Sequence, residues 1–267
     1  MTRQPTVNLI RHREAAGRGA PWRSAGVSVI SRSFSAIFSA TLLLSACASK
    51  PAPPDWQANA FAALKGFSSA YLNGNTRLAD FEFARAKSEI SSTGRADLLA
   101  RAELTRCAAR VASLEFDNCA GYQPLAADTQ AAEQAYAAYL TGQWTGLNTA
   151  LLPAQHRAMA VKAMADQPAS SVVSAGSAAP ATSMLGTVED PLARLVAAGV
   201  LLQGSRLTPA DIVAATETAS AQGWRRPLLA WLGLQLQRAH AAGDREAAMR
   251  LQRRIDLVLQ VAPPTTR

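Results

Sequence analysis

Apolar residues recur at helical spacing through most of the chain after position 54. The first such stretch begins at Asp55, where we expect an N-cap, and ends at Asn73-Gly74-Asn75. Its apolar face consists of Trp56, Ala60, Leu64, Phe67 and Tyr71. The same reasoning predicts helices over 76–91, 95–114, 128–140 (capped by Asp128), 154–166, 191–203, 208–222, 226–242 and 244–261. Because no segment alternates apolar and polar residues with period two, the sequence predicts an all-α fold.

Residues 167–188 interrupt this pattern. They carry no charge and show no helical period, which predicts a flexible linker. The linker would divide an N-terminal helical domain (55–166) from a C-terminal helical subdomain (189–262), which is followed by a tail (263–267). Short glycine-containing turns join several of the predicted helices, so we expect antiparallel helical hairpins.

The first 46 residues have the organisation of a signal peptide. Residues 1–32 carry six arginines and one acid, Glu14, and an uncharged apolar run of about 13 residues follows, Phe34 to Ala46. This run is shorter than the roughly 20 residues that span a bilayer. Translation from Val29 would give a leader of ordinary length. Residues 1–28 would then precede the true translation start. We expect the whole leader to be disordered.

The end of the apolar run, Leu44-Ser45-Ala46-Cys47, resembles the lipobox of bacterial lipoproteins. The resemblance implies cleavage before Cys47, lipidation of its thiol and acylation of its amine, and several acyl chains give stable membrane attachment. Residues 47–54 would then be a Pro-rich lipidated tether. Ala48, rather than Asp, implies sorting to the outer membrane, facing the periplasm, rather than retention in the inner membrane. If the motif arose by chance, the protein would instead be soluble in the periplasm.

The net charge of +8 first suggests a nucleic acid or an anionic membrane as partner. Without residues 1–46, however, the chain holds 21 bases and 18 acids, and residues 47–188 hold 11 of each. We therefore expect no nucleic-acid partner. The expected partners are the membrane, through the lipid, and an envelope protein. The C-terminal helices carry the remaining basic excess.

One predicted hairpin resembles the tetratricopeptide pattern of a small residue, an aromatic and another small residue on the second helix. The residues that carry this resemblance are Gly74, Ala79, Phe83 and Ala86. Gly243, Ala248 and Ile255 repeat the spacing, but Gln252 replaces the aromatic. The resemblance implies stacked helical hairpins. The alternative is an irregular Ala-rich helical bundle.

Cys107 and Cys119 remain as a pair if Cys47 is lipidated. In an oxidising compartment we expect them to form a disulfide that pins the loop after Asp117 onto the third helix. Two buried free thiols are the alternative.

The polar residues suggest no catalytic or metal motif, and we expect no cofactor. His156 and His240, the histidines after the leader, are predicted to be surface or half-buried residues. The carboxylates considered are Glu82, Glu89, Glu103, Glu115 and Glu133. If they met in one cleft, they would favour an envelope enzyme or accessory subunit acting on cell-wall or lipid material. A groove lined by aromatic residues and arginine would favour a binding protein.

Basic and aromatic residues mark three candidate partner surfaces. Arg250, Arg253 and Arg254 cluster on the last helix, where they would meet anionic lipid or an acidic partner, or lie on a solvated face. A second edge combines Trp224 and Trp231 with Arg225 and Arg226, and a third holds Tyr136, Tyr139 and Trp144. Aromatics at helical spacing are more often core residues. The expected function is a non-catalytic protein-interaction or scaffolding module of the cell envelope.

Overall fold

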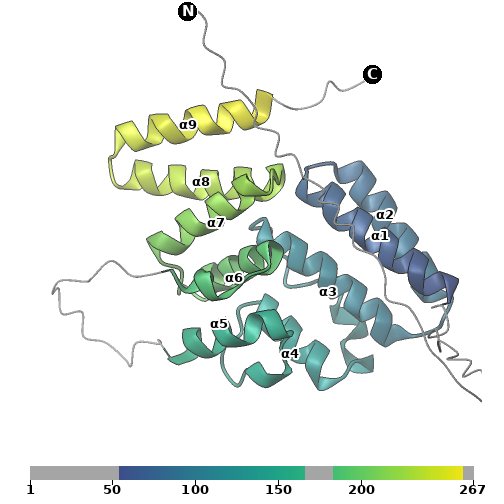
Figure 1. Ribbon diagram of the computed structural model, residues 1–267. Coiled ribbons are helices and arrows are strands. Elements are labelled where there is room, and N and C mark those ends of the chain that lie inside the picture. The colour runs from purple at the N-terminus through teal and green to yellow at the C-terminus, as the bar shows by residue number, and fades with distance from the viewer. Residues whose placement is uncertain (1–53, 166–182, 261–267) are drawn as a thin grey trace, which may run out of the picture. The chain divides into compact units, whose positions relative to one another are not determined.

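A computed structural model describes residues 54–165 and 183–260, and these residues form an all-α fold without strands (Figure 1). The helices are α1 (Asp55–Leu72), α2 (Thr76–Ser91), α3 (Ala96–Ala112), α4 (Ala131–Leu140), α5 (Ala154–Ala165), α6 (Pro191–Gln203), α7 (Pro209–Ala221), α8 (Arg225–Ala241) and α9 (Arg245–Gln260), with the 3₁₀ turns η1 (Gln123–Asp128), η2 (Thr149–Leu151) and η3 (Met184–Thr187). The predicted signal peptide, Cys47, the tether up to residue 53 and the tail lie outside the described residues.

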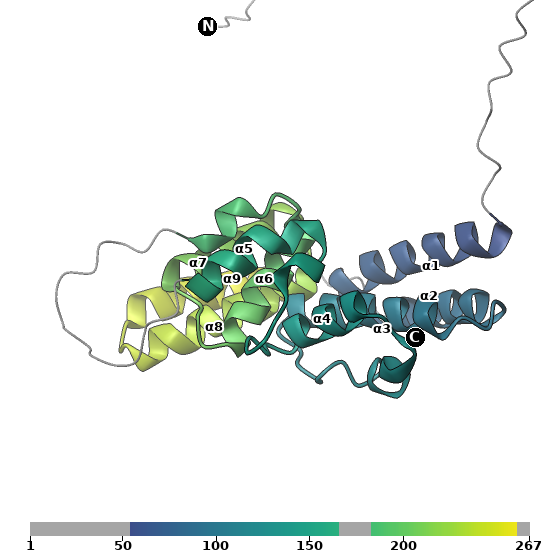
Figure 2. The same cartoon turned by 90° about the horizontal axis from the view of Figure 1, so that it is seen from below.

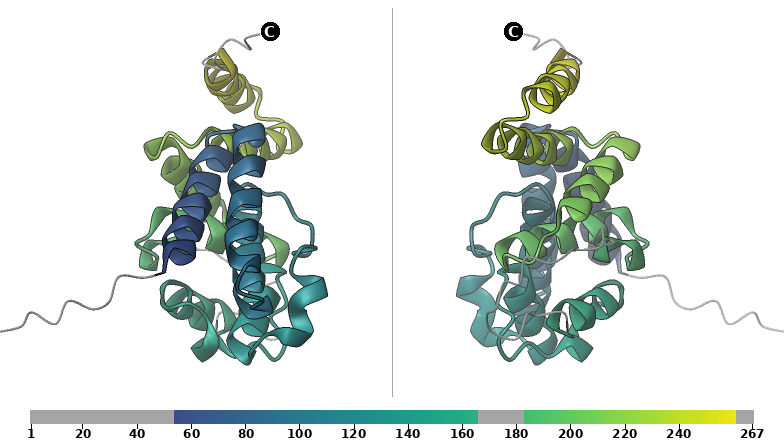
Figure 3. Two further views of the ribbon diagram at one scale, coloured as in Figure 1. Left: turned by 90° about the vertical axis from the view of Figure 1, so that its right-hand side faces the viewer. Right: turned by 90° about the vertical axis from the view of Figure 1, so that its left-hand side faces the viewer.

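Helices α1 and α2 form a tight antiparallel hairpin, seen side by side in Figure 3. The three residues of the tetratricopeptide-like pattern on α2, Ala79, Phe83 and Ala86, are buried. The Phe83 ring lies 5.1 Å from that of Phe67 on α1. Small residues on both helices thus allow close approach, and the aromatic side chains fill the seam.

Helix α3 lies between this hairpin and the remaining helices (Figures 1 and 2). Its alanines Ala102 and Ala109 belong to a core shared with α1 and α2. Its opposite face, including Leu104 and Val111, belongs to a larger core shared with α4 to α8. Both faces of α3 are therefore buried, which explains why so many of its residues are alanine.

Helices α6 to α9 pack one on the next, with α9 at the end of the row (Figure 1). Local capping sets where they begin. The Thr208 hydroxyl, one residue before Pro209, accepts a hydrogen bond from the backbone N–H of Asp211 (3.2 Å). The Asp244 carboxylate accepts one from the backbone N–H of Ala247 (2.9 Å). The sequence predicted these two caps correctly.

Two other predicted caps are wrong. Pro54 is the N-cap of α1, and Asp55 is its first helical residue, where a carboxylate still interacts favourably with the helix dipole. Asp128 ends η1, and α4 begins only at Ala131, where the backbone N–H of Gln130 donates to the Glu133 carboxylate (3.2 Å). The helix predicted over 128–140 therefore starts three residues later than expected, after the end of η1.

The end of the predicted flexible linker is instead part of the core. Met184, Leu185 and Val188 are buried around η3. The Asp211 carboxylate accepts hydrogen bonds from the Ser183 hydroxyl (2.7 Å) and the Met184 N–H (2.9 Å). The linker prediction therefore fails for residues 183–188, and residues 166–182 lie outside the described part of the chain.

The predicted boundary between two domains also requires correction. One hydrophobic core contains residues from both sides of it, among them Val111 and Met159 before the boundary and Leu195 and Trp231 after it. The described residues, 54–165 and 183–260, belong to one compact unit. The break in helical pattern therefore does not separate two cores.

Candidate functional site

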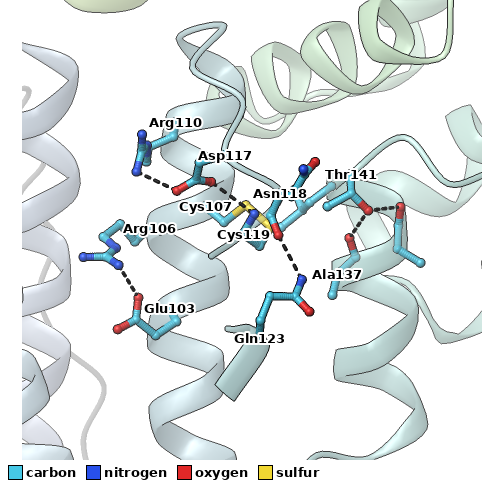
Figure 4. The surroundings of a disulfide bond; sticks show 12 residues. Glu103, Arg106, Cys107, Arg110, Asp117, Asn118, Cys119, Gln123, Ala137 and Thr141 are labelled. Carbon is cyan, nitrogen blue, oxygen red and sulfur yellow. Dashed lines mark hydrogen bonds and ion pairs between the residues drawn. A yellow bond between two sulfur atoms is a disulfide. The ribbon is translucent and has the colours of Figure 1, made fainter. Parts of the chain in front are cut away.

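The Cys107–Cys119 pair forms the expected disulfide, with Cα atoms 5.1 Å apart (Figure 4). Around it, Asp117 pairs with Arg110 of α3 (2.6 Å) and accepts a hydrogen bond from the Cys119 N–H (3.1 Å). Asn118 and Cys119 both have φ of 52°, a conformation that non-glycine residues rarely adopt. The loop after α3 is therefore held by one covalent and several polar contacts.

Each candidate carboxylate interacts with its own partner group, and none of the hollows described is lined by two of them. The pairs are Glu82–Arg85, Glu89–Asn59, Glu103–Lys87 and Arg106, Glu115–Arg226, and Glu133–Arg101. Glu103 is only 3% exposed. Its cations Lys87 and Arg106 both lie over the Phe83 ring, at 5.9 and 4.6 Å from the centroid. This arrangement joins α2 to α3 and favours a structural role for Glu103.

The two histidines have different environments. His156 is fully buried, which corrects the prediction of a surface or half-buried residue. Its Nδ1 lies 3.3 Å from the Tyr139 hydroxyl, and its ring stacks on Tyr136. Burial lowers the pKa of His156 to about 4, and burial also raises the pKa of both tyrosines. His240 is exposed on α8.

An open groove of about 800 Å³, which we call the α7–α9 groove, lies in the described surface. Helix α8 forms its floor through Gln235, Arg238 and Ala239. Ile212 and Val213 of α7 line one wall, and Ala247 and Leu251 of α9 line the other. Val213 is 54% exposed, so the groove presents aliphatic surface to solvent beside the Arg238 guanidinium. The sequence analysis did not identify this groove, because it arises where three helices meet.

The structure separates the members of the predicted partner surface. Arg250 and Arg253 of α9 are exposed, and Arg254 pairs with Glu217 of α7 (3.2 Å). Trp224 is half-buried and packs against both cores. Arg225 is also half-buried, with its Nε out of contact with solvent. Arg250 and Arg253 are thus the exposed part of the predicted surface.

Arg226 and Trp231, assigned to the same edge, connect α8 to the rest of the fold. The Arg226 guanidinium donates to the Tyr71 carbonyl (2.8 Å), the Thr76 hydroxyl (2.7 Å) and the Glu115 carboxylate (3.1 Å). The Trp231 indole donates to the Ala112 carbonyl at 3.1 Å. These contacts give both residues a structural role.

The third predicted surface is mainly core. Tyr139 and Trp144 are buried, and only Tyr136 reaches a smaller hollow of about 370 Å³. Arg101 and Arg157 line that hollow too, but each already donates a hydrogen bond, to Glu133 and to the Leu152 carbonyl. Among the hollows described, the α7–α9 groove therefore offers more unoccupied apolar surface.

Comparison with family models, curated proteins and solved structures finds no match to this chain. Within residues 54–165 and 183–260, no helix is both long and apolar enough to cross a membrane. The same residues hold no cluster of three or more His, Cys, Asp or Glu side chains arranged for a metal ion.

Proposed function

We propose that this protein is a lipid-anchored lipoprotein of the bacterial outer membrane that faces the periplasm and binds a partner protein in the α7–α9 groove. The observation that carries the binding role is the groove itself, an open and mainly aliphatic channel whose lining also includes Arg238 and Asp244. Channels of this kind accept apolar side chains from an amphipathic helix or an extended segment. The basic excess of the C-terminal helices favours a partner segment with acidic flanks.

The anchoring role rests on the lipobox-like sequence ending at Cys47. Only seven residues, 48–54, separate that cysteine from α1. Even fully extended they would span about 25 Å, so the folded body would stay close to the membrane. The Cys107–Cys119 disulfide is consistent with an oxidising compartment such as the periplasm.

A photo-crosslinking amino acid in place of Val213 tests the groove. In intact cells we expect a discrete crosslinked product that depends on light. The matched control places the same residue at Asp80, which is exposed on α2 far along the chain from the groove. A product that forms equally at both positions, or at neither, would contradict a partner in this groove.

A further inference from the structure

Among the described residues, none covers the flank of α9 that faces away from α7. A second hollow, of about 390 Å³, lies there between Leu236 and His240 of α8 and Ala248, Met249 and Gln252 of α9. Met249 is 57% exposed and Leu259 is 51% exposed. Helical-hairpin arrays normally end in a helix with a polar outer face. Here Met249 and Leu259 are exposed instead. Helix α9 lies at the end of the row of helices (Figure 1).

Helix α8 contributes a glycine to the same flank. Leu229, Gly233, Leu236 and His240 follow one another at steps of four, three and four residues, so they share one row of the helix. A Cβ atom on Gly233 would meet nothing within 4 Å. Glycine inside a helix is unfavourable relative to alanine, and no contact among residues 54–165 and 183–260 requires it. A second helix that packed closely on this row would require a glycine at position 233.

Along α9 the exposed flank has the spacing of a coiled-coil seam. Its residues are Arg245, Met249, Gln252, Asp256 and Leu259. The steps of four and three residues are those of alternating seam positions in a heptad. Arg245 has no ion pair within the described residues, and Asp256 accepts only a hydrogen bond from Gln252 (2.8 Å). The seam therefore carries opposite charges near its two ends.

We propose that two copies of this chain associate through this flank, with their α9 helices antiparallel about a twofold axis. Arg245 and Asp256 lie equally far from the midpoint between Arg250 and Leu251, so the axis at that midpoint places Arg245 opposite Asp256 of the partner subunit. The same axis places Met249 opposite Gln252 of the partner subunit. Each contact then occurs twice, as a twofold interface requires. The charge pattern of α9 is thus complementary to itself.

The dimer is expected to be reversible. Helix α9 has 16 residues and is about 24 Å long, so the pair of helices with Leu236 and Gly233 forms an interface at the small end of the range for specific complexes. The Arg245–Asp256 pairs are exposed, so added salt weakens association. The flank is separate from the α7–α9 groove, and the dimer does not depend on the proposed partner.

Charge reversal tests this arrangement in the full-length protein, purified in detergent and measured by sedimentation equilibrium. We expect the native chain to show a concentration-dependent monomer–dimer equilibrium. Arg245→Asp and Asp256→Arg each replace two attractive pairs by two repulsive ones and should raise the dissociation constant at least about tenfold. The double variant Arg245→Asp/Asp256→Arg should recover the native value. Arg238→Asp, in the other groove, should leave it unchanged.

A monomer at every concentration would overturn the proposal. It would also be overturned if neither single variant raised the dissociation constant, or if the double variant did not restore the native value. A second measurement tests the register without altering charge. Met249→Cys and Gln252→Cys chains, mixed under mild oxidation, should form a mixed disulfide. The control replaces Gln252→Cys by Leu257→Cys, which is 62% exposed on another face of α9. Equal yields in both mixtures would exclude the proposed register.

Discussion

Gly199 of α6 lies directly against the backbone carbonyl of Val111 in α3, where a Cβ atom would come within 2.4 Å of the carbonyl oxygen. This contact sets how closely α6 crosses α3. Because a backbone atom cannot move aside as a flexible side chain can, Gly199→Ala should lower the free energy of unfolding by at least about 2 kcal/mol. Urea denaturation checks this. The matched control is Gly233→Ala at protein concentrations too low for self-association, which should be neutral or slightly stabilising because its Cβ has open space.

The disulfide should contribute measurably to stability. Replacing both Cys107 and Cys119 by Ser should lower the free energy of unfolding by about 2–4 kcal/mol, because the unfolded chain gains freedom. A reductant should shift the urea midpoint of the native protein in the same direction and leave that of the double variant unchanged. Thiol counting verifies that the disulfide is fully reduced. If the urea midpoint of the native protein did not change on full reduction, the stabilising role of the disulfide would be contradicted.

Stability should fall on mild acidification because of His156. Burial lowers its pKa to about 4 in the folded state, against about 6.5 when unfolded. Between these values the unfolded chain binds the proton and the folded chain does not. The full stability is therefore present above pH 6.5, and about 3 kcal/mol is lost as the pH falls toward 4. Urea midpoints across this range should decline more steeply for the native protein than for His156→Gln. Parallel declines would show that His156 is not the titrating group.

Asp211, which completes the capping box of α7 with Thr208, should be more sensitive to substitution than the Asp244 cap of α9. Its fully buried carboxylate accepts hydrogen bonds from Ser183, Met184 and Thr208, whereas the exposed Asp244 cap accepts one, from Ala247. Asp211→Ala should cost about 3 kcal/mol, since it leaves several donors unsatisfied. Asp244→Ala should cost about 1 kcal/mol. Hydrogen exchange should also show the amides of 184–188 losing protection in the first variant only.

The contrast between these two aspartates shows how far the sequence predicts this fold. The start of α7 at Thr208-Pro209 and of α6 at Pro191 depends on neighbouring residues alone, so the pattern located both. The burial of Met184 depends on Asp211, 27 residues away, and the role of Gly199 depends on Val111 in another helix. Neither relationship leaves a local signal in the sequence.

The candidate site follows the same rule. The sequence predicted the Cys107–Cys119 pair correctly, because the cysteine count is visible along the chain. The α9 arginines stay a predicted partner surface. It missed the α7–α9 groove, since Val213 and Leu251 line the same hollow only when α7 and α9 both pack on α8. It also assigned Arg226 to a partner surface, whereas its three hydrogen bonds to α1, α2 and the end of α3 become visible only in the folded chain.

The central claim, a lipid-anchored body at the envelope, is tested most directly by the mass of the mature N-terminal peptide. Protein purified from bacterial membranes should yield a peptide that begins at Cys47 and carries the diacylglycerol thioether and an acylated amine. Cys47→Ser should abolish that peptide and release the protein from the membrane fraction. A mature chain that begins elsewhere, or that contains an unmodified Cys47, would contradict the account.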